Sequence, residues 1–252
     1  MSHDAKLALL PHLDHAAILK VYQDAPGDEL GSGKFNNPAS SAALAANVFG
    51  YFLTDPSACD LSIAGAPGEG VRTVALEAVV RFGWRGGRHP CLDALVAGDD
   101  WLVGVEAKRY EPFRAKSAAR FSSAFDRDVW GALPGWNDVR RKLQGGDLRF
   151  AMLDAAQLIK HALALSEEGR RTGRDWRLIY TYAEPGAWPD GRLIDARRHH
   201  AHRAEIDRFA AALGADAARF HAVSYRALLS SWADQELRAG KHARAVLEAF
   251  DL

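Results

Sequence analysis

The amino-acid sequence predicts an α/β fold in which a mixed β-sheet lies between layers of helices. One observation is a pair of short apolar runs around a Gly-Asp-Asp turn at residues 91–107, which predicts a β-hairpin. A second is the helix-compatible apolar spacing of residues 39–53 and 150–165, on either side of that hairpin. A third is an apolar, β-rich run at residues 175–183. The predicted order is helix, three strands, helix and strand, with additions at both ends.

The hairpin is the part of the chain with the most unusual composition. Its strands are predicted at 91–97 and 101–107, and three charged residues interrupt them: Asp93, Glu106 and Lys108. Side chains alternate between the two faces of a strand, so Glu106 and Lys108 share a face. Asp93 is on the neighbouring strand, where pairing can place it opposite them.

These three residue types together indicate a specific chemistry. Charges in apolar strands are costly unless they are paired with one another or hold a metal ion. Mg²⁺ prefers oxygen ligands, typically one or two carboxylates with water and substrate phosphate. A lysine beside such a metal can orient the attacking water and stabilise charge on the phosphate. The pattern therefore favours metal-assisted hydrolysis of phosphodiester bonds.

The same stretch resembles the active-site motif of the PD-(D/E)xK nuclease superfamily, which includes many restriction endonucleases. The matching residues are Pro90, Asp93 and the run Glu106-Ala107-Lys108. Two residues separate Pro90 from Asp93, so the literal Pro-Asp dipeptide is missing, a loss that the superfamily tolerates. The resemblance implies a restriction-endonuclease-like αβββαβ core. It also implies metal ligands at Asp93, Glu106 and the carbonyl of Ala107.

The helix predicted at 39–53 is similar to one in a bacterial branch of uncharacterised restriction-endonuclease-like proteins. In that branch a Ser-Ser-x-Ala segment leads into Asn-x-Phe-Gly. The matching residues here are Ser40, Ser41, Ala43, Asn47, Phe49 and Gly50. The resemblance extends from about residue 40 to about residue 225. For Ser41 and Asn47 we favour ordinary roles, namely a helix cap and a hydrogen bond that packs the helix.

Glu77 is a further candidate metal ligand, inside a strand predicted at 71–82. The resemblance implies that an acidic residue upstream of the hairpin can complete the metal shell. The alternative is an edge-strand glutamate paired with Arg72, Arg81 or Arg88.

Gln157, on the helix predicted at 150–165, is a candidate for a supporting role in catalysis. A glutamine on the helix after the metal-binding strands recurs near the active site of the superfamily. His161 follows four residues later on the same helix face, where some relatives carry tyrosine. The alternative is a partly exposed polar stripe.

Residues 111–149 lack a clean period but combine aromatic residues with arginines and lysines. The aromatic residues are Phe113, Phe121, Phe125, Trp130 and Trp136. This mixture suits contacts with nucleic acid, and it suits equally an irregular lid packed over the core.

The rest of the chain adds further elements at both ends. We expect helices at 5–22, 192–213 and 225–237, a short strand at 220–224, and one or two helical turns at 241–252. His199 and His202 are three residues apart and could share a metal ion, but a solvated basic helix face is favoured because no further ligand has zinc spacing.

The composition fits one globular domain over residues 1–252, with its core at about 39–183 and an extension at 192–252. Of the 252 residues, 48% are hydrophobic and 25% are charged. Cys59 and Cys91 have no disulfide framework and no metal-ligand spacing, and we expect both to be buried. No apolar run reaches the length of a membrane span, so the sequence predicts a cytoplasmic protein without membrane contacts.

The net charge is zero, but the charges are distributed unevenly. Through Lys108 there are 8 Lys and Arg against 13 Asp and Glu, and the remainder holds 24 against 19. An acidic half followed by a basic half is compatible with a metal pocket beside a phosphate-binding surface.

The predicted function is therefore a Mg²⁺-dependent nuclease acting on nucleic acid, DNA above all, with Mn²⁺ as a substitute metal. Endonuclease and exonuclease activity are both open, and a homodimer is compatible with the sequence. One alternative is a nuclease-like module that binds nucleic acid without cutting it. The other is an α/β domain whose three charges form a structural network only.

Overall fold

The computed structural model describes residues 8–84, 88–115, 121–127, 130, 133–234 and 238–252. The strands are β1 Thr73–Val79, β2 Cys91–Ala97, β3 Trp101–Lys108, β4 Asp175–Tyr182 and β5 Phe220–Ser224. The helices are α1 His15–Asp24, α2 Ser41–Phe49, α3 Pro134–Gly145, α4 Ala155–Thr172, α5 Ala196–Ala212, α6 Tyr225–Ala233 and α7 Arg238–Ala249. Short 3-10 helices are η1 Gly50–Leu53, η2 Pro56–Ala58, η3 Ser62–Ala64, η4 Glu111–Phe113, η5 Ser123–Asp126 and η6 Gly214–Arg219.

The five strands form one mixed sheet in the order β1-β2-β3-β4-β5. Neighbours from β1 to β3 are antiparallel, whereas β3, β4 and β5 are parallel. A parallel neighbour requires a crossover connection, and here helices provide it. The predicted α/β class, mixed sheet and αβββαβ order are confirmed.

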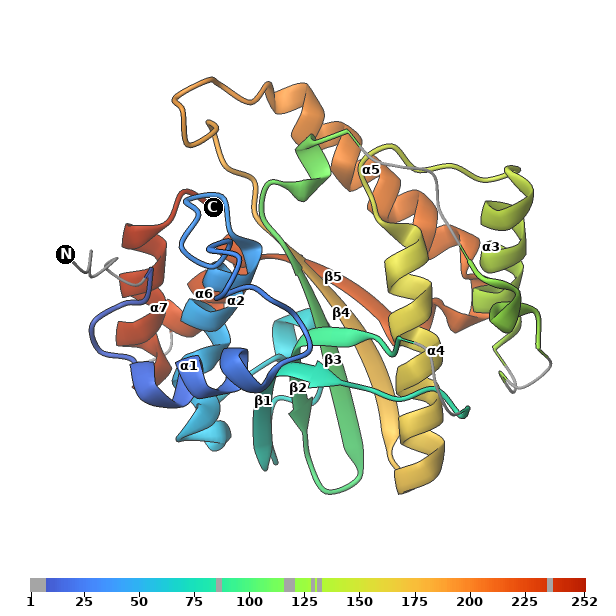
Figure 1. Cartoon of the computed structure of the whole chain (residues 1–252), viewed down its shortest axis with the longest axis horizontal. Helices are drawn as coiled ribbons and strands as arrows, with labels where there is room; N and C mark the ends of the chain where they lie inside the picture. Colours follow the sequence, from blue (N-terminus) through green and yellow to red (C-terminus); the bar gives the residue numbers. More distant parts are fainter. Residues whose placement is uncertain (1–7, 85–87, 116–120, 128–129, 131–132, 235–237) are drawn as a thin grey trace.

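Helices cover both faces of the sheet (Figure 1). Helices α1, α2, α6 and α7 lie on one face, and their core cluster includes Phe49, Phe52 and Trp232. Helices α3, α4 and α5 lie on the other face, around Trp136 and Phe209. None of the helices in the described ranges combines the length and the apolarity that crossing a bilayer requires.

Side-chain caps fix where helices α2 and α4 start. The Ser40 hydroxyl accepts the N–H of Ala43 and begins α2, and the Asp154 carboxylate accepts the N–H of Gln157 and begins α4. A side-chain oxygen at this position satisfies one of the N–H groups left unpaired at a helix start. Helix α4 is capped at its end by Gly173, the residue after Thr172, whose φ of 70° suits glycine.

The hairpin strands lie where the sequence predicts them, but several other boundaries are corrected. The first helix begins at His15, with Asp14 as its cap, rather than near residue 5; residues 1–7 are outside the described part of the chain. The helix expected at 39–53 ends at Phe49 and continues as a 3-10 turn. Helix α4 starts and ends later than expected, and α7 forms a full helix.

Helix α3 is an element that the sequence analysis missed, within the aperiodic segment 111–149. The aromatic residues of this segment pack into the core: Phe113, Phe125, Trp130 and Trp136 are buried, and Phe121 packs against the same interior. The packing alternative therefore holds for the four buried rings, because buried rings cannot serve as stacking platforms for bases.

The expectation of a solvated basic face is wrong for His202. Its ring is buried, and the hydroxyl of Tyr180 lies 2.9 Å from its Nε2. The ring of His199 also packs edge-on against an aromatic ring, that of Phe113, with centroids 5.1 Å apart. His202 is thus a core histidine that joins α5 to the sheet.

Candidate active site

The candidate site lies where strands β2 and β3 separate. Their antiparallel ladder ends at the pair Ala94 and Val105. The register between β1 and β2 is interrupted at the same level, at Glu77, whose φ of 47° lies in the left-handed region. Because Ala94 packs into the core under α2 and Leu92 into the core under α4, strand β2 changes face at Asp93.

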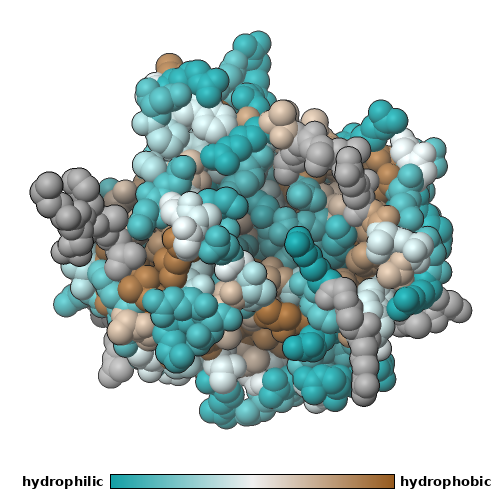
Figure 2. Space-filling model, viewed as in Figure 1, coloured by the Kyte–Doolittle hydropathy of each residue, from teal (hydrophilic) through white to brown (hydrophobic). Residues whose placement is uncertain are grey.

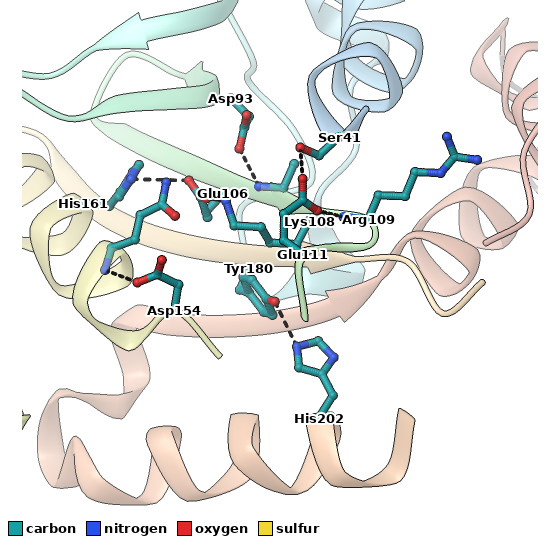
Figure 3. A network of polar contacts seen from close by, with 12 residues as sticks. Ser41, Asp93, Glu106, Lys108, Arg109, Glu111, Asp154, His161, Tyr180 and His202 are labelled. Carbon is teal, nitrogen blue, oxygen red and sulfur yellow. Dashed lines mark hydrogen bonds and ion pairs between the residues drawn. The ribbon is translucent and has the colours of Figure 1, made fainter. Parts of the chain in front are cut away.

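The Asp93 carboxylate occupies the gap that this separation opens. Its Oδ2 accepts the backbone N–H of Ala107 at 2.7 Å (Figure 3). A buried backbone N–H without a partner is costly, and here a side chain replaces the missing strand. The carboxylate of Asp93 is thereby fixed beside β3.

Glu106 and Lys108 share one face of β3, as predicted, and form an ion pair. Their side chains are only 1% and 13% exposed. Burial raises the pKa of Asp93 and of Glu106, and Glu106 raises that of Asp93 further. Burial by itself lowers the pKa of Lys108, but Glu106 and Asp93 outweigh it and raise this pKa above its ordinary value. Lys108 is therefore a stable cation among carboxyl groups.

His161 of α4 completes the buried side of the cluster. Its Nε2 lies 3.3 Å from Oε2 of Glu106 (Figure 3). Burial, and then the charge of Lys108, lower the pKa of His161 to about 3, so the ring is neutral near pH 7 and the contact is not an ion pair. Oε2 of Glu106 is buried and accepts no hydrogen bond from the described residues.

Gln157, the residue predicted for a supporting role, lies one turn before His161. It is half-buried, and its backbone N–H donates to Asp154 at 3.0 Å. Within the described ranges its side chain makes no hydrogen bond. Among the described residues, His161 thus makes the polar contact with Glu106, and no hydrogen bond joins the Gln157 side chain to the cluster.

Glu111 and Ser41 are members of the site that sequence reasoning did not assign. The Ser41 hydroxyl donates to Oε1 of Glu111 at 2.8 Å, and the N–H of Arg109 donates to Oε2 at 2.8 Å (Figure 3). Burial by itself raises the pKa of Glu111, but Lys108 and these hydrogen bonds lower it below its ordinary value. The only sequence signal was the position of Glu111, three residues after Lys108.

The expected role of Ser41 as a cap is wrong, because Ser40 provides the cap of α2. The expected packing role of Asn47 is confirmed. Its side chain accepts the N–H of Leu10 at 2.8 Å and donates to the carbonyl of Ala8 at 2.7 Å, which ties α2 to the N-terminal segment.

Glu77 lies next to the cluster, on β1. The thiol of Cys91 donates to its Oε2 at 3.4 Å. Burial, and then the charge of Asp93, raise its pKa to about 7. The alternative pairing with Arg72 is wrong, because Arg72 forms its ion pair with Asp99 at 2.8 Å.

The donor set is compatible with Mg²⁺. Asp93 and Glu106 supply carboxylate oxygens, and the buried Oε2 of Glu106 lacks a hydrogen-bond donor. Mg²⁺ commonly takes one or two carboxylates and completes its shell with water. The described residues contain no group of three or more His, Cys, Asp or Glu side chains that could hold a metal ion.

The element order, the mixed sheet and the acid-acid-lysine cluster at the separation of β2 and β3 together define a restriction-endonuclease-like protein of the PD-(D/E)xK superfamily. Residues 12–248 match REase-ARP, the family described as "Restriction Endonuclease associating with ARP". The chain belongs to this family. The comparisons with curated proteins and with solved structures gave no match.

Proposed function

We propose that this protein is a Mg²⁺-dependent nuclease that hydrolyses phosphodiester bonds in DNA. The observation that carries the proposal is the convergence of Asp93, Glu106 and Lys108 where β2 and β3 separate. The family's description as a restriction endonuclease supports DNA as the polymer. A cytoplasmic location fits this proposal and is part of it.

Asp93 and Glu106 are the proposed metal ligands, with the carbonyl of Ala107 and the carboxylate of Glu77 as additional oxygen donors. When bound, Mg²⁺ would act as a Lewis acid on the scissile phosphate and favour deprotonation of a water. The hydrogen bond from the Ala107 N–H holds one oxygen of Asp93 in place. Gln157 is proposed to support the substrate side from α4.

Lys108 is proposed to act as a cation rather than as a general base. Because its pKa is raised, it keeps its proton at neutral pH. An ammonium group can hold the attacking water by hydrogen bonds and stabilise the negative charge that develops on the phosphate. The neighbouring Glu111, whose pKa is lowered, helps to keep Lys108 charged.

The test is cleavage of supercoiled, linear and single-stranded DNA with Mg²⁺ and with Mn²⁺. We expect Asp93→Asn and Lys108→Met each to lower the rate by about 100-fold or more, since each removes a charge needed at the reacting phosphate. Asp99→Asn is the matched control, because Asp99 lies in the exposed turn of the same hairpin. Equal cleavage by the wild type and both site variants would overturn the proposal.

The alternative is a nuclease-like module that binds DNA without cutting it. The observation that favours it is that the described residues include no group of three His, Cys, Asp or Glu side chains that could hold a metal ion. A thermal unfolding series separates the two. A nuclease site should give a higher Tm with millimolar Mg²⁺ or Mn²⁺, and Asp93→Asn should remove most of that rise. A Tm that is indifferent to both metals, with DNA bound but whole, would favour the binding module.

A further inference from the structure

The segment at residues 184–195 leaves the sheet after β4 and returns to begin α5. It folds back on itself through an antiparallel bridge between Ala187 and Leu193, with Gly191 at a φ of 84° in the turn. In Figure 1 it is the pale orange loop that projects from the upper part of the molecule. Leu193 is 81% exposed.

Contacts with the residues that follow β3 fix this segment beside the candidate active site. The hydroxyl of Tyr110 donates to the carbonyl of Ala187 at 3.1 Å, and the Tyr110 ring stacks on Trp188 with centroids 5.3 Å apart. Ile194 is buried in a small cluster that includes Tyr110 and Phe113. Tyr110 is two residues after Lys108 in the chain, so Trp188 lies at the end of β3 that carries the cluster.

Two arginines are held over the Trp188 ring. The guanidinium carbon of Arg192 lies 5.0 Å from the ring centroid, and that of Arg114 lies 5.9 Å from it. Both side chains are exposed, and neither forms an ion pair with a carboxylate of the described residues. In contrast, Arg197 at the start of α5 is paired with Asp195 at 2.6 Å. Stacking on an aromatic ring restricts a guanidinium group and leaves its N–H donors free.

The position of these charges complements the site. The cluster holds several carboxyl groups but only one lysine, Lys108, so by itself it repels a polyanion. Figure 2 shows a hydrophilic hollow near the middle of the face that Figure 1 presents. Cations close to a group of carboxylates offset that repulsion and attract phosphate groups.

We propose that Arg114 and Arg192, held on Trp188, bind backbone phosphates of the DNA substrate next to the candidate active site. Guanidinium groups bind phosphate oxygens through two parallel N–H bonds, and most protein–DNA hydrogen bonds go to the backbone. The contact positions DNA without reading its sequence. The inference rests on the proposed function in that it assigns the segment to the same substrate.

The test measures binding of a labelled DNA duplex by fluorescence anisotropy at several salt concentrations, without a divalent metal so that no cleavage occurs. Each phosphate contact contributes about 0.9 to the slope of log K against log salt. We therefore expect Arg114→Gln with Arg192→Gln to reduce the slope by about 2 and to weaken binding at low salt by about 10-fold or more. Replacement of both arginines by lysine should keep most of the slope.

The matched control is Arg197→Gln, which removes another exposed arginine that already has a carboxylate partner. This variant should keep the wild-type slope. Wild-type binding by the double glutamine variant, or a wild type that binds no DNA, would overturn the inference. Because binding is measured without cleavage, a protein that binds through the two arginines but never cuts DNA would contradict the proposed nuclease and still support this surface.

Discussion

Among single residues, Glu111 differs from the two neighbouring carboxyl groups in the direction of its pKa shift. Burial raises the pKa of Asp93 and Glu106, whereas Lys108 and the donors Ser41 and Arg109 hold Glu111 in its charged form. A carboxylate that stays ionised can keep the lysine charged when its other partners are protonated or bind a cation. Glu111 thus stabilises the charged form of Lys108 through its own negative charge.

This interpretation predicts the effect of Ser41→Ala. The substitution removes one of two hydrogen bonds to a largely buried carboxylate, so the free energy of unfolding should fall by about 1–2 kcal/mol. The pKa of Glu111 should rise toward its ordinary value. The measurement is urea unfolding at pH 7, together with the pH profile of cleavage.

The matched control is Ser57→Ala. The hydroxyl of Ser57 also donates to a carboxylate, that of Asp55, at 2.8 Å, but on the exposed surface. Its loss should change the free energy of unfolding by no more than about 0.5 kcal/mol. Equal effects of the two substitutions would contradict a special role for the Ser41 contact.

The sequence predicted Asp93, Glu106 and Lys108 because they lie on one hairpin, where strand geometry relates neighbouring residues directly. It did not predict the contact of Ser41 with Glu111, which joins positions 70 residues apart. A contact of that kind depends on how α2 packs on the sheet. The contact of His161 with Glu106 has the same origin, since it depends on the packing of α4.

Among the elements, α4 is placed against the sheet by a glycine in β3. A Cβ added at Gly104 would lie 2.6 Å from Leu165 of α4 and 2.9 Å from Leu92 of β2. Contacts of that length do not occur without movement of the neighbours. The close approach of helix and strand brings His161 to Glu106.

Gly104→Ala should therefore destabilise the protein by about 1–3 kcal/mol, because the core must expand locally to accept the methyl group. Chemical unfolding measures this change. Gly27→Ala, where the nearest atom would be 3.9 Å away in an exposed loop, is the control and should be close to neutral. A Gly104→Ala variant as stable as the wild type would show that α4 can shift without cost.

The hairpin was predictable to within one residue because its period of two and its turn are local features. Helix α3 was not, because its buried residues Trp136, Val139 and Leu143 are interspersed with charged residues and follow a stretch of sequence without a clean period. The switch of β2 between faces at Asp93 was also hidden, since it depends on the interruption at Glu77 of the neighbouring strand.

Across the whole molecule, the two ends of the chain are joined through histidines. Nε2 of His12 lies 2.9 Å from Nδ1 of His242 on α7, and Nε2 of His242 lies 3.1 Å from the carbonyl of Val48 on α2. The His242 ring also stacks on Tyr51 with centroids 4.4 Å apart. The carbonyl of Val48 can only accept, so Nε2 of His242 donates to it. In the neutral ring, Nδ1 carries no proton and accepts from His12.

Burial lowers the pKa of His242 from 6.5 to about 4. Between pH 6.5 and about 4, His242 therefore binds a proton in the unfolded chain but not in the folded chain. The stability that its neutral ring contributes above pH 6.5 is lost as the pH falls toward 4. The loss from this group is roughly 3 kcal/mol. We expect the free energy of unfolding of His242→Gln to be lower than that of the wild type at pH 7.5 and to change less between pH 7.5 and 4.5.

Urea unfolding at the two pH values measures this difference. His200→Gln, on the exposed face of α5, is the control and should follow the wild type. Identical pH dependence of the wild type and His242→Gln would contradict the prediction. A single transition in all variants would support the proposal that residues 1–252 form one domain.

The hydrogen bond from the Ala107 N–H to Asp93 has a spectroscopic consequence. That amide is held by a side chain whose charge depends on protonation and on any cation nearby, whereas its neighbours in β3 are held by backbone carbonyls. Its proton chemical shift and its exchange with solvent deuterium are thus expected to follow the ionisation of Asp93. One backbone resonance would then report the state of the cluster, in the intact protein and without any substitution.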